Sequence, residues 1–165
     1  MSDSLLPADI TDLARRVVEE NRAAGRTVAV AESCTGGLVA AALTEIPGSS
    51  AVLDRGFVTY SNDAKAGSLG VSEDLIDAFG AVSIACVYAM AQGALERSGA
   101  DVAVAVSGIA GPDGGSEQKP VGTVMFARAV RGSEEPEAES KVFEGQDRAG
   151  VRRQATLAAL ELLLP

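Results

Sequence analysis

Apolar residues recur along this chain at two different spacings, which predict helices and strands in alternation. In residues 5–24 the apolar positions follow a helical spacing, and Gly25 is suited to end that helix. Residues 27–31 form a short apolar run with the length of a buried strand. The alanine-rich segment 36–46 again fits a helix, which ends before residues 47–48, a Pro-Gly pair.

The same alternation continues through the middle of the chain. Residues 55–60 predict a second strand. Ser72 and Ser83 are suited to cap two further helices, because a serine hydroxyl accepts from the free N–H groups of a first turn. We expect these helices to end at Gly80 and Gly99.

The last third of the chain adds strands and a final helix. Residues 102–106 are continuously apolar, which is typical of a strand covered on both faces. Residues 108–122 are rich in glycine and proline and predict a long loop. An acidic turn at 133–139 is expected to join the last two strands. Those two strands and the final helix are expected at residues 124–130, 141–143 and 147–163.

Strands that alternate with helices predict one α/β domain over residues 1–165. We expect a three-layer α/β/α sandwich around a mostly parallel, mixed sheet in which the last strand pair is antiparallel. The length of 165 residues suits one sizeable core and is short for two. We find no internal repeat and no linker.

Composition limits the kinds of partner. The chain is 47% hydrophobic and 22% charged, as in soluble globular proteins, and its net charge is −9. That charge disfavours binding to nucleic acid backbones and to anionic membranes. Aromatic residues make up 4% of the chain, which disfavours stacking on bases. We therefore expect a small-molecule substrate, with no nucleic acid and no membrane partner.

The chain has two cysteines and no histidine. These residues form neither a disulfide framework nor a plausible zinc ligand set, so we expect no metal site. No apolar run approaches the length of a membrane span, and the N-terminal residues lack the pattern of an export signal. The expected location is the cytoplasm.

Residues 31–37, Ala-Glu-Ser-Cys-Thr-Gly-Gly, link the first predicted strand to the next helix. A serine on a tight strand-to-helix turn can act as a nucleophile beside free backbone N–H groups. Ser33 is the candidate nucleophile, and the N–H groups near Thr35 and Gly36 are candidates to hold an oxyanion. Gly36 and Gly37 would let a substrate approach the backbone. The alternative is that Ser33 or Thr35 only caps the helix.

The absence of histidine excludes a Ser-His-Asp triad, so the base must be a lysine, a tyrosine or a carboxylate. Tyr60 and Lys65 follow the second strand, and carboxyl ends of parallel strands share one edge of a sheet. At pH 7 about one free lysine in 2,500 is neutral, so a lysine base needs a strongly lowered pKa. Burial or a nearby cation such as Arg55 would lower it. The alternative for Lys65 is a solvated helix residue.

Cys34 is a second candidate nucleophile. A thiol at a helix N-terminus can have a lowered pKa without a histidine. A free cysteine is more often a small buried apolar residue, and we favour that interpretation for Cys34.

The loop after the third strand contains the sequence Ser-Gly-Ile-Ala-Gly-Pro-Asp-Gly-Gly at 107–115. Such a loop can present N–H groups to a phosphate or a ribose, although it matches no standard nucleotide-binding motif and is also compatible with a long surface turn. Arg148, Arg152 and Arg153 gather at the start of the last helix. The candidate substrate-binding residues are Gly37, Asn62, Gly108, Ala110, Gly111, Gly114 and Arg148.

Taken as a set, these segments resemble the CinA C-terminal domain family. The resemblance rests on residues 31–37, 55–65, 80–83, 107–124 and 145–155, and so extends over almost the whole chain. It implies a nicotinamide-nucleotide amidase that hydrolyses nicotinamide mononucleotide to nicotinic acid mononucleotide and ammonia, without a cofactor. It also implies a catalytic set of serine, tyrosine and lysine, here Ser33, Tyr60 and Lys65, in which lysine acts directly or through the tyrosine hydroxyl.

Two points stay open at this stage. A domain of this kind is also compatible with a non-catalytic nucleotide-binding module, or with a partner module in competence or DNA damage. The apolar end of the last helix, Leu162–Leu164, is a candidate contact with a second copy, which would give a homodimer.

Overall fold

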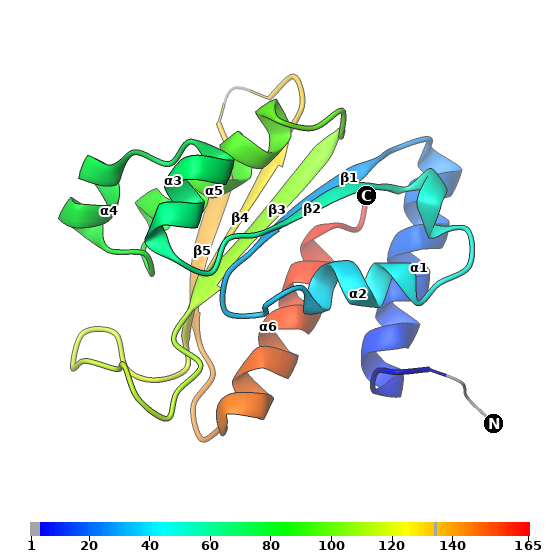
Figure 1. Cartoon of the computed structure of the whole chain (residues 1–165). Helices are drawn as coiled ribbons and strands as arrows, with labels where there is room; N and C mark the ends of the chain where they lie inside the picture. Colours follow the sequence, from blue (N-terminus) through cyan, green and yellow to red (C-terminus); the bar gives the residue numbers. More distant parts are fainter. Residues whose placement is uncertain (1–3, 134) are drawn as a thin grey trace.

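The computed structural model describes residues 4–133 and 135–165, so Glu134 of the predicted acidic turn lies outside the described residues. Helices and strands alternate as predicted (Figure 1). The helices are α1 (Ala8–Ala24), α2 (Leu38–Thr44), α3 (Asn62–Leu69), α4 (Glu73–Phe79), α5 (Ile84–Glu96) and α6 (Arg148–Leu162), with a short 3-10 turn at Ser49–Ala51. The strands are β1 (Val28–Glu32), β2 (Leu53–Val58), β3 (Val102–Gly108), β4 (Thr123–Val130) and β5 (Glu137–Val142).

The five strands form one mixed sheet in the order β2-β1-β3-β4-β5. β1 is parallel to both β2 and β3, whereas β4 is antiparallel to β3 and to β5. The predicted α/β class, mixed sheet and antiparallel last pair are confirmed.

Helices cover both faces of the sheet, which gives three layers (Figure 1). Successive side chains of a strand point to opposite faces. In β1, Val28 and Val30 therefore join the core formed with α1, α2 and α6, while Ala29 and Ala31 join the core formed with α5. The small alanines allow α5 to lie against the sheet, and α3 and α4 pack on α5 in turn.

Several predicted boundaries are wrong. The first helix begins at Ala8, and Leu5 is exposed. The helix capped by Ser83 ends at Glu96, with Arg97 as its C-cap, and not at Gly99. The last strand begins at Glu137, where the prediction placed a turn, because β5 is an exposed edge strand without an apolar signal.

The parallel half of the sheet creates a place for a ligand. The connection from β1 to β2 through α2 crosses one face, and the connection from β2 to β3 through α3, α4 and α5 crosses the other. Ligands of open α/β sheets bind where neighbouring connections leave in opposite directions, at the carboxyl ends of the strands. In Figure 1 these ends face the loop that follows β3 and the start of α6.

The end of α6 packs on its own domain. Leu163 is buried in the core, and Leu162 and Leu164 pack against that core. The apolar C-terminal residues therefore do not indicate a second copy, and a homodimer stays a prediction without that support. No helix in the described part of the chain is long and apolar enough to cross a membrane.

Candidate active site

Ser33 and Lys65 meet at the carboxyl edge of the sheet. Ser33 follows β1 directly, and its N–H donates to the carbonyl of Val106 in β3 at 2.9 Å. Lys65 lies in α3, whose first turn is capped by the hydroxyl of Ser61. The Nζ atom of Lys65 is 2.9 Å from Oγ of Ser33. The sequence predicted both residues, and the structure places them in direct contact.

The amine of Lys65 is buried, with 1% of the residue exposed. It also donates to the backbone carbonyls of Thr59 at 2.8 Å and Tyr60 at 3.2 Å. Burial lowers the pKa of Lys65 because a charged amine is poorly stabilised away from water. The alternative of a solvated helix lysine is therefore wrong.

Arg55 does not contribute to this environment. Its side chain pairs with Asp54 and donates to the carbonyl of Arg97. The prediction that Arg55 lowers the lysine pKa is wrong, because the side chain is occupied at another position on the surface.

Neither Ser33 nor Thr35 caps the helix that follows. The N-cap position of α2 is Gly37, which has no side chain to act as a cap. A carboxylate takes that role from the strand before the turn: Glu32 accepts from the N–H groups of Val39 and Ala40. Ser33 is therefore free of the structural role that the alternative interpretation gave it.

The candidate oxyanion donors change in one respect. The N–H of Gly36 donates to the carbonyl of Ser33 at 3.0 Å and so is committed to the turn itself. In contrast, the N–H groups of Cys34 and Thr35 donate to no other residue within residues 4–133 and 135–165. These two N–H groups are therefore more available than the N–H of Gly36 to donate to an oxyanion.

Gly36 and Gly37 provide the backbone conformation of the turn. Both have positive φ angles, 59° and 102°, which side chains rarely allow. A Cβ atom at Gly36 would face Arg152, and one at Gly37 would face Val58. Neither glycine lines the cavity at Ser33.

Cys34 is buried, and burial raises its pKa to about 11. The interpretation of Cys34 as a buried thiol is supported, because a thiolate would be costly there.

Tyr60 contributes through two different groups. Its carbonyl accepts from Lys65, whereas its hydroxyl lies 3.2 Å from Nη2 of Arg148. The side chain is at the mouth of the site, with 61% of the residue exposed. Arg148 is held by the carbonyl of Gly111 at 2.7 Å. The hydroxyl of Tyr60 is thus hydrogen-bonded to an arginine and not to the amine or to Ser33.

A cavity of about 220 Å³ opens beside the Ser33–Lys65 pair. A neighbouring cavity of about 500 Å³ shares Ala110 and Arg148 with it. The first cavity combines predicted residues with three that the sequence analysis did not single out, Ala81, Val82 and Ser107. Its lining consists of Ser33, Cys34, Tyr60, Lys65, Ala81, Val82, Ser107, Gly108, Ala110 and Arg148.

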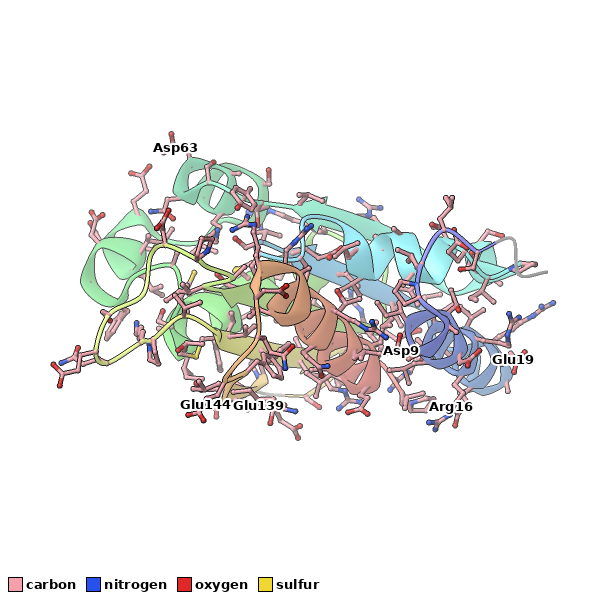
Figure 2. The ribbon with its side chains drawn as sticks, turned by 90° about the horizontal axis from the view of Figure 1, so that it is seen from below. Asp9, Arg16, Glu19, Asp63, Glu139 and Glu144 are labelled. Carbon is pink, nitrogen blue, oxygen red and sulfur yellow. The ribbon has the colours of Figure 1, made fainter. Side chains whose placement is uncertain are left out.

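Other predicted substrate-binding residues lie elsewhere. Asn62 lines a separate cavity of about 360 Å³ with residues of α4. Gly114 is exposed and lines neither cavity beside Ser33. Gly111 acts only through its carbonyl. Arg153 pairs with Asp9 at 2.7 Å, in the region between α6 and α1 where Figure 2 labels Asp9.

Acidic side chains lie on the outer surface of the fold. Figure 2 shows labelled carboxylates such as Asp63 and Glu144 projecting from the outside of the fold. Within the described ranges, no group of three or more cysteine, aspartate or glutamate side chains is arranged to hold a metal ion.

Fold and site together define an α/β protein with a buried serine–lysine pair in a pocket at the carboxyl edge of its sheet. The chain belongs to the CinA C-terminal domain family, whose model matches residues 10–165. Nicotinamide-nucleotide amidohydrolase PncC of Escherichia coli (strain K12) is 54% identical over 164 residues, which cover 99% of this chain and 95% of that protein. PncC of Pseudomonas putida is 52% identical over 155 residues, 94% of this chain and 95% of that protein.

Solved structures and longer relatives agree with this assignment. The crystal structure of competence/damage inducible protein CihA from Agrobacterium tumefaciens matches with a TM-score of 0.93 at 51% identity, covering 97% of this chain and 96% of that one. A longer relative from Symbiobacterium thermophilum is 56% identical over 146 residues, and the match spans 34% of its length.

Proposed function

We propose that this protein hydrolyses the carboxamide of nicotinamide mononucleotide to give nicotinic acid mononucleotide and ammonia, a salvage reaction of pyridine nucleotides. Near full-length similarity to two amidohydrolases of that name supports the substrate. The observation that carries the chemistry is the 2.9 Å contact between the buried amine of Lys65 and the hydroxyl of Ser33.

The contacts of Lys65 suit a neutral amine that acts as a base. A neutral amine has two N–H bonds and one lone pair. Two carbonyls, of Thr59 and Tyr60, are in position to accept the two N–H bonds, which leaves the lone pair for the Ser33 hydroxyl. Lys65 therefore takes the proton directly, without the hydroxyl of Tyr60.

The reaction then follows in two halves. Oγ of Ser33 attacks the carboxamide carbon while Lys65 takes its proton, and the N–H groups of Cys34 and Thr35 stabilise the oxyanion. Lys65 returns that proton to the nitrogen as the C–N bond breaks, and ammonia leaves. Water, deprotonated by the same amine, then attacks the acyl-enzyme, and the proton goes back to Ser33.

The cavities suit the two ends of the nucleotide. The carboxamide must reach Ser33, so the pyridine ring occupies the cavity of about 220 Å³. The ribose and phosphate extend toward Arg148 and the neighbouring cavity. Arginine pairs well with phosphate, and the glycine-rich loop lies on the same side.

A binding module without catalysis is the other function compatible with the family. A binding module does not require a lysine with a lowered pKa beside a serine. Groups with shifted pKa values cluster at catalytic sites. The serine–lysine contact therefore favours the enzyme.

Ammonia release distinguishes the two functions. We expect release from nicotinamide mononucleotide, with less from the riboside and from free nicotinamide, which lack the phosphate. Ser33→Ala should abolish release while the circular dichroism spectrum and the melting temperature are retained. Binding of the nucleotide by calorimetry without any ammonia would show a binding module and overturn the proposal.

A further inference from the structure

Glu32 is a buried carboxylate at a position that the chemistry above does not use. It is the last residue of β1 and directly precedes Ser33, with 1% of the residue exposed. In the described part of the chain it forms no ion pair. Burial of a carboxylate is costly unless hydrogen bonds compensate it, so its contacts indicate what it is for.

Glu32 receives three hydrogen bonds, and all of them come from residues around the nucleophile. The hydroxyl of Thr35 donates to Oε1 at 2.6 Å. The N–H of Val39 donates to Oε1 at 2.9 Å and that of Ala40 to Oε2 at 3.1 Å. One side chain thus connects the end of β1, the middle of the turn and the first turn of α2.

Arg152 holds the same turn from α6. Its Nε atom donates to the carbonyl of Cys34 at 3.1 Å, and Nη2 donates to that of Thr35 at 3.4 Å. The carbonyl of Cys34 and the N–H of Thr35 belong to one planar trans peptide, so they point in opposite directions. A guanidinium that fixes the carbonyl therefore also fixes the direction of that free N–H.

We infer that Glu32 is a positioning residue of the reaction: it fixes the 33–37 turn so that Oγ of Ser33 stays beside Lys65 and the N–H groups of Cys34 and Thr35 keep their direction. This inference rests on the proposed function for its kinetic test. Glu32 touches no reacting atom and acts through the turn. Its loss should therefore reduce the rate of the chemical step more than the binding of substrate.

The test is Glu32→Gln with Asp101→Asn as a matched control. The amide keeps the shape, but its NH₂ group accepts no hydrogen bond, so whichever oxygen of Glu32 it replaces loses its donors. We expect kcat to fall about 10²-fold with KM within about twofold, because small displacements of reacting groups cost that much. Asp101 accepts from the N–H and the hydroxyl of Thr27 at the opposite end of β1, so Asp101→Asn makes the same carboxylate-to-amide change at a hydrogen-bonded acid remote from Ser33 and should leave kcat unchanged.

Thr35 provides a second variant pair if Glu32→Gln does not fold. Thr35→Val removes the hydroxyl that donates to Glu32 and should reproduce the loss of kcat, whereas Thr35→Ser keeps that hydroxyl and should lose less. Equal kcat losses in Glu32→Gln and Asp101→Asn, or a rise in KM alone, would overturn the inference. So would equal activity of the Thr35→Ser and Thr35→Val variants.

A substrate-independent measurement separates this inference from the proposed function. A fluorophosphonate probe reports the reactivity of Ser33 whatever the natural substrate is. If wild-type protein is labelled but releases no ammonia from nicotinamide mononucleotide, the proposed substrate fails, and slower labelling of Glu32→Gln than of Asp101→Asn still supports the inference. Equal labelling rates of these two variants would contradict it.

Discussion

The hydroxyl of Tyr60 lies 3.2 Å from Nη2 of Arg148, while the backbone carbonyl of the same tyrosine accepts from Lys65. The backbone and the side chain of Tyr60 thus contact different parts of the site. The backbone carbonyl helps to hold the amine of Lys65, and any residue type at position 60 would supply that carbonyl. The side chain belongs to the mouth of the cavity, where Arg148 also connects to Gly111.

Tyr60→Phe should therefore affect substrate binding more than the chemical step. The variant keeps the carbonyl and the ring and loses only the contact with Arg148. We expect KM for nicotinamide mononucleotide to rise about three- to tenfold, the cost of a typical hydrogen bond, with kcat within about threefold. Steady-state ammonia release measures both constants. A kcat lower by about 10²-fold at unchanged KM would instead place the tyrosine hydroxyl in the proton path.

The rate should increase with pH through the ionisation of Lys65. The base is active only when neutral, and burial lowers its pKa from the ordinary value of a lysine. The acid limb of kcat/KM should accordingly have a midpoint below about 10.4, the pKa of a free lysine. The chain has no histidine, so no imidazole contributes to this limb.

A pH series of kcat/KM from pH 5 to 10 measures that midpoint. Lys65→Arg is the informative variant, because a guanidinium stays charged at every accessible pH. It should be inactive across the whole series, without recovery at high pH. A wild-type limb centred at or above the pKa of free lysine would contradict a buried amine as the base.

Cys34→Ala should leave catalysis nearly intact. With a pKa raised to about 11, the thiol is almost entirely protonated at neutral pH and is a poor nucleophile. We expect kcat to stay within about threefold of wild type, since the turn contacts at this position are made by the backbone. At pH 7.5 iodoacetamide should alkylate Cys34 far more slowly than it alkylates the thiol of glutathione, as followed by mass spectrometry. Loss of ammonia release in step with rapid alkylation would make Cys34 the nucleophile.

Gly93→Ala should lower both stability and activity although the residue is remote from the cavity. A Cβ atom there would collide with the backbone carbonyl of Leu69 at the end of α3, the helix that carries Lys65. Overpacking of this kind costs about 1–3 kcal/mol, and here it displaces the base. Gly67→Ala is the control, because Gly67 lies in α3 with nothing within 4 Å of its Cβ position.

Thermal unfolding and ammonia release compare these two variants. Gly67→Ala should be neutral or more stable by about 0.5–1 kcal/mol, as expected for a glycine replaced within a helix, and should remain active. If both variants melt at the same temperature with the same kcat, then α3 is not held against α5 as described.

Local patterns were sufficient to predict the architecture, because alternating apolar spacings gave the α/β class. The rule that parallel strands end at one edge made a meeting of Ser33 and Lys65 possible, but it was the resemblance to the CinA C-terminal domain family that singled out this pair. Helix caps at Ser72 and Ser83 were correct, because capping depends on residues within one turn. Boundaries failed at β5, where an exposed edge strand has no apolar signal.

Contacts between distant elements were beyond these patterns. The placement of Arg55 depended on which way its side chain leaves β2, and it was predicted wrongly. Asn62 lines a separate cavity, and its role in substrate binding stays a prediction. Arg152 reaches the nucleophile turn across a separation of 118 residues, which no local spacing reveals. Glu32 did carry a signal: an acidic residue that continues an apolar strand is unusual in a core and requires partners.

The strand that leads to Ser33, β1, and the helix that carries Lys65, α3, both pack on α5. The alanines of β1 lie under α5, and Gly93 of α5 meets the backbone of α3. These contacts behind the site therefore leave no room for an added methyl group, because alanine and bare backbone have no rotamer with which to absorb it. Space for bulkier amides would have to come from the loop after β3 and the first turn of α6, which line the neighbouring cavity.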